Sequence, residues 1–180
     1  MRLDEPAGDA VPRFGQADTW WWSLSAGAAH DFDEATDVNV NIAARYFLAE
    51  DVEFTIELGL WYYNQPGDDA LGLNPNMVFR WHCVNRERFT LYADVGIGVV
   101  IATDDVPAAR EIEGEVEDGT PFAFTPRAGV GATFRLDESS GARAEIGLRW
   151  AHVSNARLTG DDDNPARDSA MLYAGLIFPF

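Results

Sequence analysis

Eight segments of this chain alternate apolar with polar side chains, and no other feature of the sequence constrains its fold as strongly. Successive side chains of a β-strand point to opposite faces, so a period of two predicts a strand with one apolar and one polar face. No long stretch follows the helical period, and the nine prolines and 16 glycines fall mostly between or inside the short runs. We therefore predict an all-β chain with strands over approximately 18–29, 37–48, 51–64, 72–84, 87–101, 123–136, 141–154 and 169–180.

The polar face of these segments distinguishes between two kinds of barrel. A soluble, lipocalin-like barrel turns its apolar face inward, whereas a membrane barrel turns that face to lipid and fills its lumen with polar side chains. Charges of both signs on one face suit a narrow lumen that is packed by ion pairs. The polar face carries both signs here, with Arg45, Arg80, Arg127, Arg135, Arg143 and Arg149 beside Glu53, Glu57, Asp94 and Glu145.

Aromatic residues and loop lengths also favour the membrane barrel. The connections at 48–51, 84–88 and 136–141 are short, whereas those at 30–36, 64–70, 103–121 and 154–168 are longer, as expected for periplasmic turns and outer loops. We predict an eight-stranded antiparallel transmembrane β-barrel with a polar, side-chain-filled interior. Its two aromatic girdles would hold Trp20, Trp22, Tyr46, Trp81, Phe89, Phe134 and Phe180 at one level and Tyr62, Phe124 and Trp150 at the other.

The predicted barrel forms one domain over residues 18–180, and residues 1–17 form an irregular N-terminal lead-in. No run approaches the roughly 20 apolar residues that a membrane helix needs. The N-terminus lacks a basic start followed by an apolar core, so we expect the mature form, without signal peptide, of a bacterial outer-membrane protein. An even strand number leaves both termini on the periplasmic side, and the terminal Phe180 resembles the C-terminal signature of outer-membrane barrels.

Charge and composition narrow the classes of partner. The net charge is −17 and all 13 basic residues are arginine, which argues against nucleic acid because its phosphates need a basic surface. Cys83 is the only cysteine, so no intrachain disulfide can form. No Cys, His or Asp cluster has the spacing of a metal site, and we expect no cofactor.

A possible catalytic pair stands at the end of one strand, in the run Leu-Arg-Trp-Ala-His-Val-Ser-Asn at 148–155. His152 and Ser154 are two residues apart and therefore share the apolar face. A serine hydroxyl becomes a strong nucleophile when a base takes its proton, and an acid orients that base. Asp168 opens the next antiparallel strand on the same face and is our first choice for the acid. The alternatives are a loop acid, from 161–163, or no acid at all, and in each case the pair predicts a hydrolase with an apolar substrate.

The last third of the chain resembles the lipid A 3-O-deacylase (PagL-like) family. The similarity is carried by the stretches 124–131 and 149–156, by Asn164-Pro165 and by the hydrophobic last strand with its terminal Phe. Members are eight-stranded outer-membrane barrels that remove the 3-position acyl chain of lipid A by Ser–His–acid hydrolysis. The resemblance implies His152 as the base, Ser154 as the nucleophile and Asn155 as a contributor to the oxyanion hole. Members use a Glu as the acid, where this chain offers Asp168.

These observations predict an outer-membrane esterase that removes an ester-linked acyl chain from lipid A by Ser/His/acid catalysis at the outer rim of the barrel. Its partners would be the acyl chains of lipid A or lipopolysaccharide and the surrounding outer-membrane lipid. The main alternative is a non-enzymatic small outer-membrane barrel with a structural or binding role through its acidic outer loops. A soluble lipid-carrying barrel, with the apolar face inside, is a third hypothesis.

Overall fold

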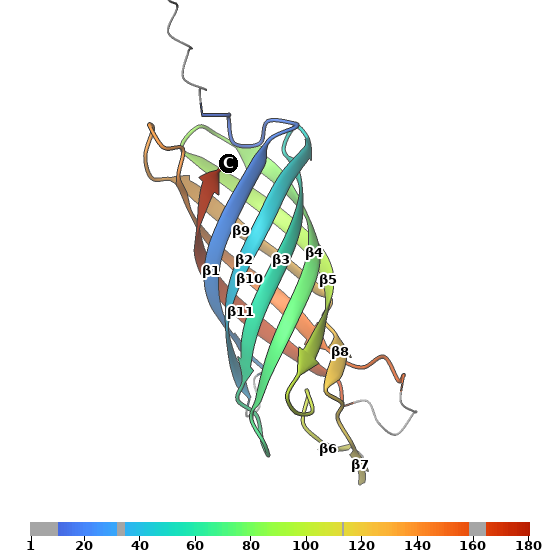
Figure 1. Ribbon diagram of the computed structural model, residues 1–180. Helices are drawn as coiled ribbons and strands as arrows, with labels where there is room; N and C mark the ends of the chain where they lie inside the picture. Colours follow the sequence, from blue (N-terminus) through green and yellow to red (C-terminus); the bar gives the residue numbers. More distant parts are fainter. Residues whose placement is uncertain (1–10, 32–34, 113, 159–164) are drawn as a thin grey trace, which may run out of the picture.

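The computed structural model describes residues 11–31, 35–112, 114–158 and 165–180, which form a barrel of tilted antiparallel strands (Figure 1). No described segment is a helix of the length and apolarity that crossing a membrane requires. The strands are β1 (Trp20–His30), β2 (Thr36–Ala49), β3 (Val52–Tyr63), β4 (Ala70–Asn85), β5 (Phe89–Ala102), β6 (Arg110–Ile112), β7 (Glu115–Glu117), β8 (Phe122–Phe124), β9 (Arg127–Arg135), β10 (Arg143–Val153) and β11 (Arg167–Pro179).

Neighbouring strands pair antiparallel all the way round the barrel. The order β4-β3-β2-β1-β11-β10-β9-β5 is closed by the pairing of β4 with β5, so the sheet leaves no long edge. Closure satisfies the backbone hydrogen bonds that an open edge would expose to lipid. With β8 and β9 counted as one strand, the predicted eight-stranded antiparallel barrel is confirmed.

The sixth predicted strand, 123–136, is interrupted where the structure has β8 and β9. Both pieces pair with β5, through Val99↔Phe124 on one side and Gly96↔Arg127 on the other. Pro126 lies between them and has no N–H to give to the ladder. A second departure from the sequence prediction is the short hairpin of β6 and β7, which lies within the connection predicted as a loop over 103–121.

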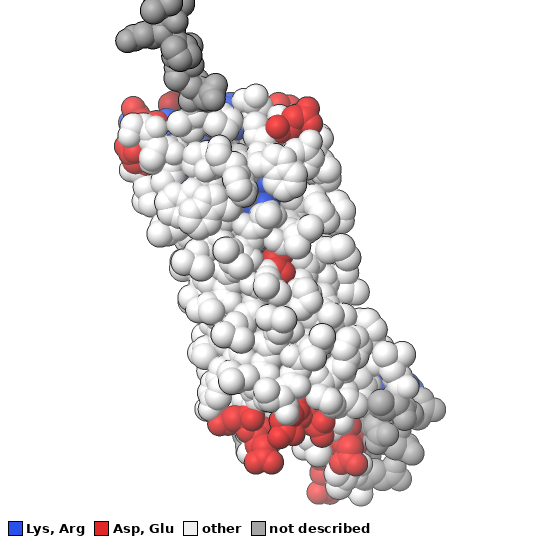
Figure 2. Space-filling view, viewed as in Figure 1, with Lys and Arg blue, Asp and Glu red and all other residues white. Residues whose placement is uncertain are grey.

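The apolar side chains of the strands face outward. In β3, Ile56, Leu58 and Leu60 are each at least 43% exposed, whereas the alternate residues Glu53, Thr55 and Glu57 are at most 6% exposed. A soluble barrel would show the opposite pattern, so the third hypothesis is wrong. In Figure 2 an uncharged band covers most of the visible barrel wall, with acidic side chains gathered mainly at its two ends.

The interior is filled by arginines and carboxylates that neutralise one another. Arg149 pairs with Asp94 at 3.0 Å and with Glu57 at 3.5 Å. A methyl group at Gly129 would lie 2.5 Å from Arg149 Cγ, so glycine makes room for the arginine stem. Such pairing offsets part of the cost of burying each charge. Other interior ion pairs of the described residues include Arg45–Glu53, Arg45–Glu145, Arg80–Asp94, Arg80–Glu145, Arg127–Glu57 and Arg167–Asp37.

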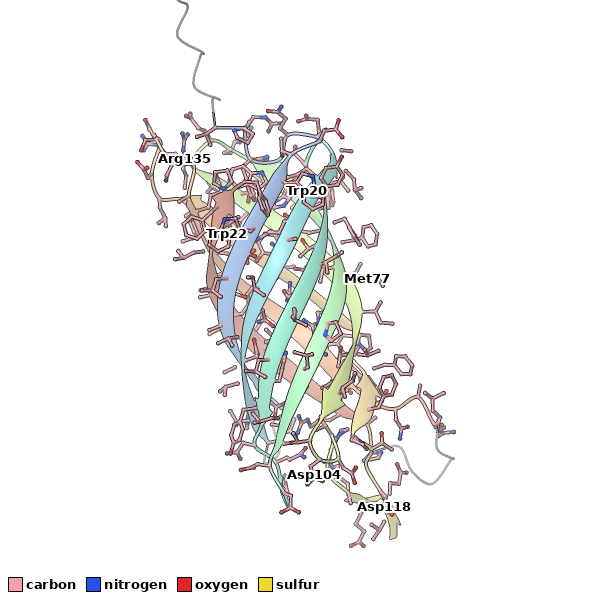
Figure 3. All side chains as sticks on the ribbon, in the orientation of Figure 1. Trp20, Trp22, Met77, Asp104, Asp118 and Arg135 are labelled. Carbon is pink, nitrogen blue, oxygen red and sulfur yellow. The ribbon has the colours of Figure 1, made fainter. Side chains whose placement is uncertain are left out.

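The two ends of the barrel differ, and Figure 3 marks both. Short turns and the C-terminus lie at the end where Arg135, Trp20 and Trp22 are labelled, which is the periplasmic end of an outer-membrane barrel. Aromatic rings pack on its outer surface, with Trp22 stacked on Phe178 at 4.6 Å. The opposite end carries the longer loops, including Asp104 and Asp118.

The described part of the predicted lead-in packs across the periplasmic mouth. Residues 11–19 contain no strand, yet Phe14 is 5% exposed and packs edge-on against Trp21, Phe47 and His82. The N–H of Asp51 donates to the carbonyl of Gly15 at 2.8 Å and fixes the segment to the β2–β3 turn. This segment therefore covers the barrel interior at the end with the short turns.

Candidate active site

His152, Ser154 and Asp168 meet on the outer surface of the barrel, at the end with the longer loops. His152 lies in β10, Ser154 follows its last residue, and Asp168 lies near the start of β11. The register of the two strands places His152 directly opposite Asp168. Alternation along β10 keeps His152 and Ser154 on one face, so the antiparallel ladder brings all three predicted residues together.

The three side chains form a continuous hydrogen-bonded chain. His152 Nδ1 lies 2.9 Å from Asp168 Oδ1, and His152 Nε2 lies 3.0 Å from Ser154 Oγ. An ionised carboxylate only accepts hydrogen bonds, so Nδ1 carries the proton and Nε2 of the neutral ring is an acceptor. The Ser154 hydroxyl then donates to Nε2, which is the direction that general-base activation of a serine requires.

Trp150 is a fourth member of this cluster, which the sequence analysis placed only in an aromatic girdle. Its indole Nε1–H donates to Asp168 Oδ1 at 2.7 Å, the same oxygen that accepts from His152. The Trp150 and His152 rings lie 5.7 Å apart with planes inclined by 30°. Two donors from β10 thus hold one carboxylate oxygen of β11 in position. The spacing 150, 152, 154 on one face was visible in the sequence, but the partner of the indole was not.

The main chain around Ser154 is fixed by a bridge to β8. Ser154 N–H donates to the Phe124 carbonyl at 3.1 Å, and Phe124 N–H donates to the Ser154 carbonyl at 2.7 Å. The N–H of His152 donates to the carbonyl of Pro126 at 3.0 Å. The strand interruption at Pro126 therefore lies beside His152 and Ser154, and main-chain hydrogen bonds from the β8–β9 side hold both residues.

Asn155 begins a tight turn immediately after Ser154. It is buried, and its Oδ1 accepts from the N–H of Arg157 at 2.9 Å. Ala156 and Arg157 both have left-handed backbones, with φ of 56° and 60°, and the N–H of Leu158 donates to the Asn155 carbonyl. Left-handed non-glycine residues are uncommon and gather at functional sites. The role of Asn155 in an oxyanion hole stays a prediction.

The surroundings of the site are apolar on the membrane side. The Asp168 side chain is 64% exposed and that of His152 is 22% exposed. A shallow groove of about 350 Å³ lies beside Asp168, and its lining includes the apolar side chains of Leu148, Trp150 and Ala170 together with Asp31 and Ser169. In the ladder the small Ala170 stands opposite Trp150, which leaves the groove open there.

Some predicted residues lie outside the described part of the chain. These are the alternative acids Asp161, Asp162 and Asp163, and Asn164 of the Asn-Pro pair. Among the described residues, no group of three or more His, Cys, Asp or Glu side chains is arranged to hold a metal ion. Of the predicted acids, Asp168 is the one that lies within the described residues, and it contacts His152.

Comparisons with known proteins agree on the fold and identify a family. The sequence profile of a family described as lipid A 3-O-deacylase (PagL) matches residues 16–176. No curated protein matches the sequence.

Several solved barrels are similar in structure. Neisserial surface protein A (NspA) has a TM-score of 0.61 at 14% identity, over 89% of this chain and 97% of that protein. The outer membrane enzyme PagL has a TM-score of 0.56 at 19% identity, over 89% and 99% of the two chains. The outer membrane protein OprG from Pseudomonas aeruginosa has a TM-score of 0.57 at 12% identity, over 94% and 99%.

At these identities the structural similarity establishes the fold, a small outer-membrane barrel, and nothing about activity. The family profile covers the barrel from before β1 to residue 176 of β11, and with it the three residues of the hydrogen-bonded chain. The chain belongs to the lipid A 3-O-deacylase (PagL) family.

Proposed function

We propose that this protein is an outer-membrane esterase that removes an ester-linked acyl chain from lipid A at the outer rim of its barrel. The observation that carries the proposal is the hydrogen-bonded chain from Asp168 through His152 to Ser154, on the lipid-facing side of the wall. Membership of the lipid A 3-O-deacylase family supports the substrate class.

The chemistry follows from the direction of the two hydrogen bonds. Ser154 Oγ attacks the ester carbonyl carbon while His152 Nε2 takes its proton, and Asp168 stabilises the imidazolium through Nδ1–H. The tetrahedral intermediate collapses, the C–O bond to the sugar breaks, and His152 returns the proton to the leaving alkoxide. Water, deprotonated by His152, then hydrolyses the acyl-enzyme and releases a fatty acid and free Ser154.

Donors for the negative oxygen of the intermediate would come from the turn after Ser154. Oxyanion stabilisation needs N–H groups aimed at the developing charge. Ser154 N–H is already bonded to the Phe124 carbonyl, so we assign this role to the following residues, with Asn155 as predicted from the sequence. The proposed mechanism uses only side chains, main-chain N–H groups and water, and no cofactor takes part in it.

The position of the site suits an amphipathic ester. A charged side chain costs about 2–4 kcal/mol at the bilayer midplane but about 0–1 kcal/mol near the interface, so a His–Asp pair is tolerable at the rim. The ester bonds of a membrane lipid lie at this depth, with the head group in water and the acyl chains in the bilayer. The groove beside Asp168, with its Leu148 and Trp150 walls, would accept one such chain.

Mass spectrometry of lipid A tests the proposal. Lipopolysaccharide is incubated with the refolded protein, and we expect the lipid A mass to fall by one acyl group. The Ser154→Ala variant should fold normally and leave the mass unchanged, whereas Ser139→Ala, in a turn at the opposite end, should act like wild type. Deacylation by Ser154→Ala at the wild-type rate would refute the mechanism. An unchanged mass with wild type would favour the non-enzymatic alternative.

A further inference from the structure

A cavity at the periplasmic mouth lies at the opposite end of the barrel from the proposed active site. Its volume is about 620 Å³, and the lead-in segment forms one side of it through Val11–Phe14. Figure 3 labels Arg135 of its rim at this end. The polar side chains of the lining come from the lead-in segment, from the β4–β5 and β9–β10 turns and from the adjoining strand ends. They are Arg13, Asn85, Arg86, Glu87, Arg135, Glu138, Ser139 and Arg143.

Arg143, on the inner wall of this cavity, is an unneutralised buried cation. It is 3% exposed, yet it has no carboxylate partner among the described residues. Its Nε donates to Thr133 Oγ1 at 2.8 Å, its Nη1 donates to the Glu87 carbonyl at 3.4 Å, and its buried Nη2 has no partner among the described residues. The face of the guanidinium rests on the Phe14 ring, 4.6 Å from its centroid. Nη2 is therefore a buried donor that lacks an acceptor.

The other buried arginines of the described barrel differ from Arg143 in having carboxylate partners. Each of them forms an ion pair with at least one interior carboxylate. Leaving a buried charge uncompensated costs several kcal/mol, so an arginine without a carboxylate points to an anion that comes from elsewhere. The cavity beside Arg143 is open to the periplasmic side and is large enough to admit one.

The charge of the lining is opposite to that of the protein. The chain has a net charge of −17, but the cavity holds four arginines and two glutamates. Two of these arginines are already paired, Arg13 with Glu50 and Arg135 with Glu87. Arg86 is exposed, and neither Arg86 nor Arg143 has an ion pair among the described residues. The positive charge of the cavity is thus confined to Arg143 and Arg86, and a guanidinium edge matches the spacing of two oxygens of a phosphate group.

We propose that this cavity binds a phosphate-class oxyanion from the periplasm, either inorganic phosphate or a phosphate monoester of a small solute. The anion would accept hydrogen bonds from the unpartnered Nη2 of Arg143, which would have to turn toward the cavity, and from Arg86 at the rim. This site is independent of the acyl hydrolysis proposed above, because it uses none of the same residues.

Isothermal titration calorimetry of the folded full-length protein in a zwitterionic detergent tests the site, with inorganic phosphate as the probe at constant ionic strength. We expect saturable binding to one site, and a second titration with glycerol phosphate shows whether monoesters are accepted. The Arg143→Gln variant should raise the Kd by about tenfold or more, because a charge-assisted bond is lost. Folding is checked by heat-modifiable mobility on electrophoresis.

Two further full-length variants keep the test decisive if Arg143→Gln does not fold. Arg86→Gln, on the exposed rim, should weaken phosphate binding. Arg88→Gln should leave phosphate binding unchanged, because Arg88 is also exposed but does not line the cavity. Binding that chloride competes with equally well, or equal loss in both variants, would overturn the proposal.

Discussion

Replacing Trp150 by phenylalanine should slow the proposed deacylation without unfolding the barrel. The indole N–H donates to Asp168 Oδ1 at 2.7 Å, and His152 Nδ1 lies 2.9 Å from the same oxygen. Phenylalanine keeps an aromatic ring on the outer face but removes this donor. The carboxylate can then rotate away from the imidazole, and His152 spends less time aligned with Ser154. Trp150 is therefore a positioning residue that acts through Asp168.

The size of the effect follows from the strength and the exposure of this bond. A hydrogen bond to a charged group contributes about 1.5–3 kcal/mol, but the Asp168 side chain is 64% exposed, and water competes for the freed oxygen. We therefore expect a loss of about 1 kcal/mol in transition-state stabilisation. Since about 1.4 kcal/mol corresponds to a tenfold change, kcat/KM should fall about fivefold. Most of the loss should appear in kcat, because the ring that lines the groove is retained.

Single-turnover deacylation of lipopolysaccharide in mixed micelles measures this change. Trp81→Phe is the matched control, because Trp81 is 61% exposed on the outer face at the other end of the barrel. A double-mutant cycle with Asp168→Asn separates positioning from general destabilisation. Trp150→Phe should have little further effect in the Asp168→Asn protein. Equal losses from Trp150→Phe in both backgrounds, or an equal loss from Trp81→Phe, would refute the reasoning.

Three other changes test the site and the barrel. Asp168→Asn should lower kcat by at least about a hundredfold, toward the roughly 10⁴-fold loss seen when the acid of a Ser-His-Asp triad is replaced, with the lipid A mass as the readout. Glu53→Gln should lower the free energy of unfolding by about 3–5 kcal/mol in urea titrations, because it breaks a buried ion pair, whereas the exposed pair lost in Glu87→Gln should cost about 1 kcal/mol or less. Burial, followed by the charges of two neighbouring aspartates, raises the pKa of Asp105 above its ordinary value. A carboxyl with a raised pKa in the folded state destabilises that state once it ionises, so the protection of amides in loop 103–121, measured by hydrogen exchange relative to the intrinsic rate at each pH, should rise as the pH falls toward the raised pKa.

The barrel could be predicted from the sequence because the two features that define it, strand alternation and a charged polar face, can be read within single strands. Alternation along each strand fixes which residues share a face, and charges of both signs on the polar face show that this face must be the interior. The proposed catalytic pair could be found in the same way, since His152 and Ser154 lie two residues apart at the end of one strand. Asp168 followed because a hairpin returns its second strand beside the first.

Features that depend on register or on long-range packing were not predictable in the same way. Trp150 reaches Asp168 because the register places His152 opposite Asp168, and the length of the connecting loop alone does not determine that register. Phe14 belongs to no alternating segment, so nothing in the sequence indicated that it would pack inside the periplasmic mouth. Arg143 has no carboxylate partner among the described residues, and only the assembled ion pairs of the interior reveal this.

The filled interior also explains why a hydrolytic site would lie on the outer wall. Arginine–carboxylate pairs occupy the lumen from Arg45 near one end to Arg167 near the other, and a chain of apolar groups could enter only by displacing them. Removing one partner of such a pair costs about 3–5 kcal/mol, more than an acyl chain entering the lumen would easily offset. The outer face carries no such cost, because it is already apolar and in contact with lipid. A lipid substrate can therefore reach Ser154 by lateral diffusion in the membrane, while the rigid ion-paired core holds the strand register on which the hydrogen-bonded chain depends.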